Sequence, residues 1–133
     1  MARGIEGLER LRRRLDAMPA KARAAAVKMV NKSADELVAQ MKAIAPVSQD
    51  KNPGELRDSV RKEEGRLGDV SAVVLADAKD DKGRPYAARV ELGHMAPDGS
   101  QVPAEPFFYP VVRVNRARIK RRLARAISKG LRE

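Results

Sequence analysis

The sequence contains no cysteine and no tryptophan, and it has a single histidine, His94. Without cysteine, disulfide bonds, thiolate metal sites and cysteine nucleophiles are excluded. No apolar run approaches the roughly 20 residues that a membrane span needs, and the first residues lack the apolar core of a secretory signal. We therefore expect a protein that is made in the cytoplasm and that has no contact with a membrane.

Groups that could carry out catalysis are also scarce. General acid–base chemistry usually needs a histidine or paired carboxylates in a cleft, and His94 directly follows a glycine without a second histidine nearby. Adjacent carboxylates such as Asp80 and Asp81 do not converge on a strand or turn, and the glycines form no phosphate-binding pattern. We predict no enzyme and no catalytic, cofactor-binding or metal-binding residues, with His94 as a loop residue that bonds to the backbone.

Positive charge is in excess and unevenly distributed. The chain has 28 Lys and Arg against 18 Asp and Glu, which gives a net charge of +10 and a pI of about 10.4. Residues 1–45 carry a net charge of +5, residues 46–109 carry −3, and residues 110–133 carry +8. Such a chain is expected to meet polyanions or acidic protein surfaces.

Hydrophobic periodicity predicts helices at both ends of the chain. Apolar residues at three- and four-residue steps predict a short amphipathic helix before Pro19, and a long helix over residues 20–44. The long helix begins with the alanine-rich stretch 22–26, which permits close approach of another backbone. A third helix is expected from Val112 to about Gly130, with a basic circumference. The buried positions expected on these helices are Ile5, Leu8, Leu11 and Leu15, then Val27, Val30, Ala34, Leu37, Val38, Met41 and Ile44, and finally Ile119, Leu123, Ile127 and Leu131.

The middle of the chain reads as short strands joined by polar turns. After a brief helical turn at 55–59, residues 60–67 are almost all charged and predict an edge strand, and residues 70–77 predict a β-favouring strand. Alternation of apolar and charged residues predicts a further strand from Tyr86 to Leu92, which Gly93 ends and in which residues 87, 89 and 91 point outward. A tight turn at 80–83 would join the last two strands as an antiparallel hairpin.

All four aromatic residues, Tyr86, Phe107, Phe108 and Tyr109, lie in one stretch of the chain. Pro103, Pro106 and Pro110 fix the backbone around three of them, so residues 103–110 are expected to be extended and non-helical. Neighbouring side chains of an extended segment point opposite ways. The aromatic residues can therefore fill the core between sheet and last helix, present an interface, or do both.

These elements predict a single α+β domain over residues 1–133. It would contain N-terminal helices, a short one and then a long one, a small antiparallel sheet of three to four strands covered on one face, and a C-terminal basic helix. The short helix, residues 1–18, could attach loosely. The uncovered sheet face would be solvated or would meet another subunit.

An ordered set of motifs resembles a known family. Ala45-Pro46-Val47 follows the long helix, Tyr86-Ala87-Ala88 leads into Val90-Glu91-Leu92-Gly93-His94, and Pro103-Ala104-Glu105-Pro106-Phe107 precedes the last helix. From about residue 25 to the end, this order resembles the small neck and tail-completion proteins that join heads to tails in long-tailed bacteriophages, prophages and gene transfer agents. One departure is the stretch 48–54, which is longer than the Asp-Thr-Gly that the family commonly has there.

The resemblance implies a non-enzymatic virion structural protein that forms a ring at the head–tail junction. Its partners would be copies of itself and tail tube, tail terminator or head-connector proteins. It would lie in the host cytoplasm during assembly and then in the virion neck or tail. The residues expected at a subunit or partner interface are Tyr86, Arg89, Glu91, His94, Pro103, Pro106, Phe107, Phe108 and Tyr109.

The alternative function is a stand-alone basic nucleic-acid-binding protein. A basic helix face is sufficient for sequence-independent phosphate contact, although no aromatic residues are interleaved with it as single-strand binders require. The same face could instead be solvated or paired with an acidic neighbouring subunit. The candidate DNA-facing residues, which would contact packaged DNA through its phosphates, are Arg118, Arg121, Arg122, Arg125 and Lys129.

Overall fold

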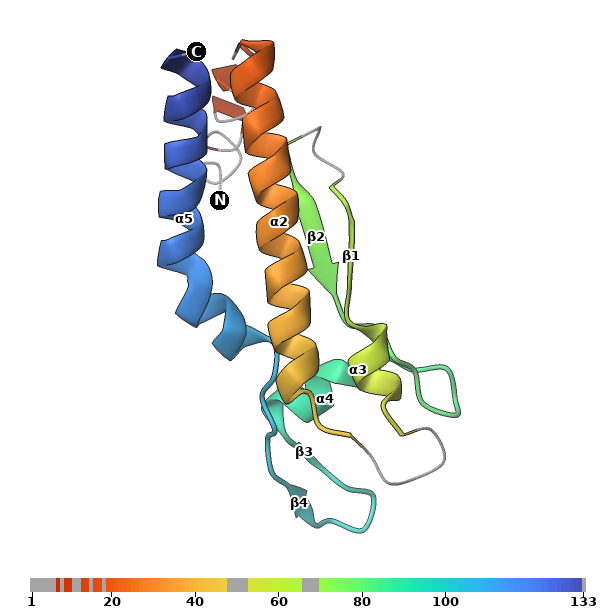
Figure 1. The fold of residues 1–133 in the computed structure, drawn as a ribbon. Helices are drawn as coiled ribbons and strands as arrows, with labels where there is room; N and C mark the ends of the chain where they lie inside the picture. The colour runs from red at the N-terminus through yellow and green to blue at the C-terminus, as the bar shows by residue number, and fades with distance from the viewer. Residues whose placement is uncertain are drawn as a thin grey trace.

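Two long helices and a two-stranded sheet form three successive layers of the molecule. The computed structural model describes residues 7, 9–10, 13–14, 16–17, 19–47, 53–65 and 70–132. Helix α2 (Ala20–Ile44) lies between helix α5 (Tyr109–Arg132) on one side and the sheet on the other (Figure 1). The α+β fold class predicted from the sequence is confirmed.

Helix α2 begins and ends as the sequence predicts. Pro19 immediately precedes it with φ −54° and ψ 146°, and the segment after it is Ala45-Pro46. Ala22 and Ala26 at its alanine-rich start are fully buried. A Cβ atom added to Gly130 of α5 would lie only 2.6 Å from the Cα of Ala22. The helices therefore cross in near backbone contact, as the small side chains permit.

The sheet is smaller than the three to four strands predicted. Strand β1 (Arg61–Glu64) pairs antiparallel with β2 (Ala72–Leu75), and β3 (His94–Met95) pairs separately with β4 (Gln101–Val102). The short helix α3 (Glu55–Ser59) precedes β1, as expected. Four strands are present in the described residues, but they form two sheets of two strands each.

The predicted strand over residues 86–92 is wrong, because Ala87–Leu92 is helix α4. Six residues are too few to separate a two-residue period from a helical one. In the helix, Val90 packs against the core and Glu91 is buried, whereas Leu92 is 73% exposed. The expected outward direction of Glu91 is thus also wrong. Gly93 ends the helix with φ 78°, where a Cβ atom would clash with backbone atoms of residues 102 and 104.

The predicted hairpin around residues 80–83 keeps its turn but not its second strand. The amide of Gly83 donates to the carbonyl of Asp80, and a single bridge pairs Lys79 with Pro85. Beyond Pro85 the chain enters α4, so β2 has no strand on its second edge among the described residues.

Helix α5 starts earlier than predicted, at Tyr109, with Pro110 in its first turn. Proline is tolerated there because the first amides of a helix have no partner within the helix. Of the four positions expected to be buried on it, Ile119, Leu123 and Ile127 are half-buried and Leu131 is 55% exposed. That prediction was wrong for Leu131, which lies beyond the crossing with α2.

Part of the predicted N-terminal helix lies outside the described residues. Residues 7, 9–10, 13–14 and 16 are helical, and the amide of Ala17 donates to the carbonyl of Arg13. The apolar residues on which the prediction depended, namely Ile5, Leu8, Leu11 and Leu15, are not described. In the described part of the chain, no helix has the length and apolar character required to cross a bilayer.

The core lies where the end of α2 meets the aromatic segment. Phe107, Met41 and Val60 are its largest fully buried side chains. The aromatic segment therefore contributes to the core directly. The other buried members of the cluster are Ala45, Leu56, Ala78 and Val111.

The close crossing of α2 and α5 can be tested with Gly130→Ala, in which a gain in helix propensity opposes a steric clash in their effects on stability. In an exposed helix interior, Gly130→Ala should raise the free energy of unfolding by up to about 1 kcal/mol. Here the new methyl group would meet the backbone at Ala22, and overpacking costs about 1–3 kcal/mol. We expect Gly130→Ala to lower stability in urea unfolding. A stabilised variant would contradict the close crossing.

Candidate functional site

Glu91 holds the aromatic segment in place. Its Oε2 atom accepts hydrogen bonds from the amides of Phe107 and Phe108 at 2.8 and 3.0 Å, and Oε1 accepts one from the amide of Tyr109 at 3.0 Å. The residue is only 7% exposed. The amide of Tyr109 is the first of α5, and those of Phe107 and Phe108 immediately precede it. At a helix start the N–H groups lack partners within the helix, and a negative charge nearby is favourable. Glu91 is thus a buried cap for a helix that starts 18 residues later.

The three consecutive aromatic residues divide between core and surface. Phe107 is 1% exposed, Phe108 is half-buried, and Tyr109 is 56% exposed. Neighbouring rings stack edge to face, with centroids 6.2 and 5.6 Å apart. The segment therefore fills the core with the ring of Phe107 and leaves the ring of Tyr109 exposed, whereas its role as an interface stays a prediction.

Beside these rings lies a shallow apolar hollow of about 280 Å³, which we call the assembly face. Its floor comes from β2, α4 and the aromatic segment, and Leu92 and Tyr109 at its rim are strongly exposed. Most of the residues that form it are apolar, and its one carboxylate, Glu91, is already bonded. The residues lining the assembly face are Val74, Leu75, Ala76, Ala87, Ala88, Glu91, Leu92, Phe107, Phe108 and Tyr109.

The other predicted interface residues do not lie on this face. Tyr86, His94 and Pro103 line a separate hollow of about 230 Å³, where burial raises the pKa of the Tyr86 hydroxyl. The Nδ1 atom of His94 is buried and makes no hydrogen bond with the described residues, so the expected bond to backbone is absent from that atom. Pro106 is exposed outside both hollows. Most of the predicted interface residues are thus divided between two hollows, and Arg89 and Pro106 lie in neither.

Arg89 is held by the turn that precedes α4. Asp80 accepts hydrogen bonds from the amides of Lys82 and Arg84 at 3.0 and 2.9 Å, and from Nη2 of Arg89 at 3.0 Å. These hydrogen bonds lower the pKa of Asp80 to about 2. The bond from the Arg84 amide has the largest effect, and the bond from the Arg89 side chain adds to it. Asp80 thereby fixes the entry of the chain into α4.

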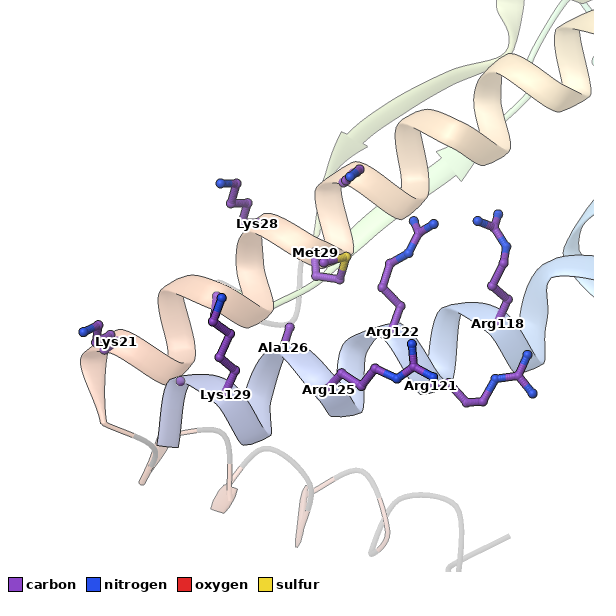
Figure 2. A pocket seen from close by; sticks show the side chains of 12 residues that line it. Lys21, Lys28, Met29, Arg118, Arg121, Arg122, Arg125, Ala126 and Lys129 are labelled. Atoms are coloured by element: carbon purple, nitrogen blue, oxygen red, sulfur yellow. The ribbon is translucent and has the colours of Figure 1, made fainter. Parts of the chain in front are cut away.

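The second candidate surface is a groove between α2 and α5, which we call the basic groove. It has a volume of about 740 Å³, and cations from both helices line it. In Figure 2, the side chains of Arg118, Arg122 and Lys129 extend from α5 towards α2. The lining residues are Lys21, Ala25, Lys28, Met29, Lys32, Arg118, Arg121, Arg122, Arg125, Ala126, Lys129 and Gly130.

One carboxylate neutralises part of this groove. Glu36 Oε2 lies 2.6 Å from Nη1 of Arg122 and 3.4 Å from Nη2 of Arg118. The hydrogen bond from Arg122 lowers the pKa of Glu36, so the carboxylate stays ionised at neutral pH. The side chain of Arg118 is held from a second side by Asn115, whose Oδ1 atom accepts a 2.8 Å hydrogen bond from Nη2 of Arg118.

All five candidate DNA-facing residues predicted from the sequence line the basic groove, but the sequence analysis missed its second rim. That rim is formed by Lys21, Lys28 and Lys32 of α2. Their spacing of seven and four residues places them on one helical stripe, which was a signal available in the sequence. What it could not reveal was that this stripe lies opposite α5. No cluster of three or more metal-ligating side chains occurs among the described residues.

Comparison with known protein families places most of the chain in a family of phage proteins. A family model described as "Bacteriophage HK97-gp10, putative tail-component" matches residues 9–93, which is well over half of the chain. The matched segment includes α2, the β1–β2 sheet and α4 with Glu91. No curated protein matches the chain, and no solved structure matches it.

The buried cap can be tested by changing Glu91. Glu91→Ala leaves three amides without their acceptor, and the bond from the Phe107 amide is buried whereas those from Phe108 and Tyr109 are half-buried. Because a buried amide left unpaired costs about 1–3 kcal/mol, we expect a loss of at least about 1 kcal/mol in urea unfolding. Glu91→Gln keeps the size and one acceptor oxygen, so it should lose less. Equal stability of Glu91→Ala and the parent protein would contradict the cap.

The Asp80 turn predicts a pH dependence. Because its folded pKa is lowered to about 2, the contribution of Asp80 to stability is fully present above its ordinary pKa near 4. That contribution is lost as the pH falls towards 2. The midpoint of thermal unfolding should be lower for Asp80→Asn at pH 6, and the difference should disappear near pH 2. The neighbouring exposed Asp81→Asn serves as the control and should show no comparable difference at pH 6.

Proposed function

This chain belongs to the HK97-gp10-like family of bacteriophage tail components, and on that premise we propose that it forms a ring at the head–tail junction. In this proposal the protein is a non-enzymatic structural component of the neck or top of the tail. Copies of the chain contact one another through the assembly face. The flanking partners are tail tube, tail terminator or head-connector proteins.

The observation that carries this proposal is the open edge of β2 beside the assembly face. β1 is protected against further pairing because its residues, Arg61–Glu64, are all charged. β2 reads Ala-Val-Val-Leu and has no charge, and its second edge is unpaired among the described residues. An apolar, unpaired edge strand is a site for association with another chain.

The exposed apolar residues support the same surface. Leu92 is 73% exposed and Tyr109 is 56% exposed at the rim of one hollow, next to the open strand. Contiguous exposed apolar surface with aromatic residues marks protein interfaces more often than scattered single residues do. A second copy of the chain is the occupant that a ring requires. Its contacting surface must differ from the assembly face, because a ring is built from heterologous contacts.

The proposal predicts that one exposed charge disrupts assembly. Leu92→Asp places a carboxylate on the assembly face, where burial against a partner would leave it unpaired. We expect the parent protein to form closed oligomers or to attach to tail tubes, as measured by light scattering after size-exclusion chromatography and by electron microscopy. Leu92→Asp should remain a folded monomer under the same conditions.

Val114→Asp is the matched control. Val114 is 81% exposed on α5 and does not line the assembly face, so its replacement should leave assembly intact. Oligomers that persist in Leu92→Asp would overturn the assigned face. A parent protein that stays monomeric and never attaches to tails would overturn the ring itself, and would favour the alternative of a stand-alone nucleic-acid-binding protein.

A further inference from the structure

We propose that the basic groove binds the phosphate backbone of duplex DNA without sequence preference. The site comprises both rims of the groove, on α2 and α5, rather than the C-terminal helix alone. The inference depends on the groove and holds whether or not the chain assembles into a ring.

Part of the positive charge of the groove, on its α5 rim, is not compensated by ion pairs among the described residues. Eight lysine and arginine side chains line it, and no carboxylate is among its lining residues. Glu36, beside the groove, pairs with Arg118 and Arg122. Within the described part of the chain, no ion pair involves the remaining cations of the α5 rim, which are Arg121, Arg125 and Lys129. Like charges held together repel one another, and an anionic ligand relieves that repulsion while releasing its own counterions.

The two rims match in length. Lys21 and Lys32 are 11 residues apart on α2, and Arg118 and Lys129 are 11 residues apart on α5. At 1.5 Å per residue each rim is about 16 Å long. Duplex DNA rises about 3.4 Å along its axis for each phosphate of one strand, so each rim spans the axial rise of roughly five base pairs. Because each strand winds around the axis over that length, a straight rim can contact only some of these phosphates. The close crossing of Ala22 and Gly130 fixes the separation of the rims at one end.

The chemistry of the groove favours duplex DNA over single-stranded nucleic acid and over an acidic protein segment. No aromatic residue lines it, so it offers no surface on which single-stranded bases could stack. Its apolar floor consists only of Ala25, Met29, Ala126 and Gly130. An acidic protein segment normally anchors itself with large side chains in pockets, which such a floor does not provide. Phosphates on a stiff duplex need only the cations.

The test measures binding of a fluorescent 30-base-pair duplex to the full chain by anisotropy, at several salt concentrations. The groove variant carries Arg121→Glu, Arg125→Glu and Lys129→Glu. The control variant carries Arg113→Glu, Arg116→Glu and Lys120→Glu, which change the net charge equally on the same helix but lie outside the groove. Circular dichroism checks that both variants are folded.

We expect the parent protein and the control to bind with similar affinity and a steep salt dependence. The groove variant should bind at least tenfold more weakly. Its slope of log K against log salt should be less steep by about 0.9 for each phosphate that the variant no longer neutralises. Lys28→Glu with Lys32→Glu on the opposite rim should also weaken binding, since the site spans two helices.

Other outcomes overturn the proposal. Equal losses in the groove and control variants would mean that net charge alone attracts DNA. Full affinity after reversal of Lys28 and Lys32 would assign the site to α5 alone. Tighter binding of poly-glutamate than of the duplex, in the same assay at matched charge, would assign the groove to an acidic protein partner. No duplex binding at 50 mM salt would remove the site altogether.

Discussion

A carboxylate that binds three backbone amides is the interaction on which the shape of the molecule depends. Glu91 belongs to α4, and its partners are the amides of Phe107 and Phe108, just before α5, and of Tyr109, the first residue of α5. The loop between them carries only the two-residue strands β3 and β4. The cap therefore ties the start of α5 to the body across that loop, and it does so inside the core, where an unpaired carboxylate would be costly.

Both candidate surfaces follow from this attachment. The cap fixes the first turn of α5, so that the preceding Phe107 enters the core and Tyr109 is exposed. From there α5 runs back along α2 towards the start of that helix (Figure 1). The assembly face forms at the attached end of α5. The basic groove forms at the far end, where Gly130 and Ala22 are in contact. A single helix thus connects an apolar surface to a cationic one.

Sequence patterns were sufficient for the elements whose cause is local. Pro19 and Ala45-Pro46 mark the two ends of α2. The charged run after Ser59 and the apolar run after Ser71 contain the observed strands β1 and β2. The prediction of a strand over residues 87–92 was wrong because the alternation of apolar and charged residues there fits a strand as well as a short helix. The deciding factor is the position of Glu91, whose three partners lie 16–18 residues later in the chain. No local pattern contains that information.

The candidate sites divide in the same way. The basic face of α5 was predictable because its cations are close in sequence, whereas Lys21, Lys28 and Lys32 join them only through the crossing of two helices. Likewise, nine residues near the aromatic segment were expected at one interface. Of these, Glu91, Phe107, Phe108 and Tyr109 line the assembly face. Arg89 bonds to Asp80 instead, and Tyr86, His94 and Pro103 line the other hollow.

The separation of the two surfaces has a consequence for how they could work together. In a closed ring, contacts between neighbours lie around the circumference, while the surface facing the axis is left open. An apolar edge at one end of α5 and a cationic groove at its other end leave both surfaces accessible at once, because neither includes residues of the other. Neighbour contact and phosphate contact then do not compete for the same side chains. The salt dependence of the phosphate contact should therefore not be shared by the apolar contact, whose driving force is the burial of non-polar area.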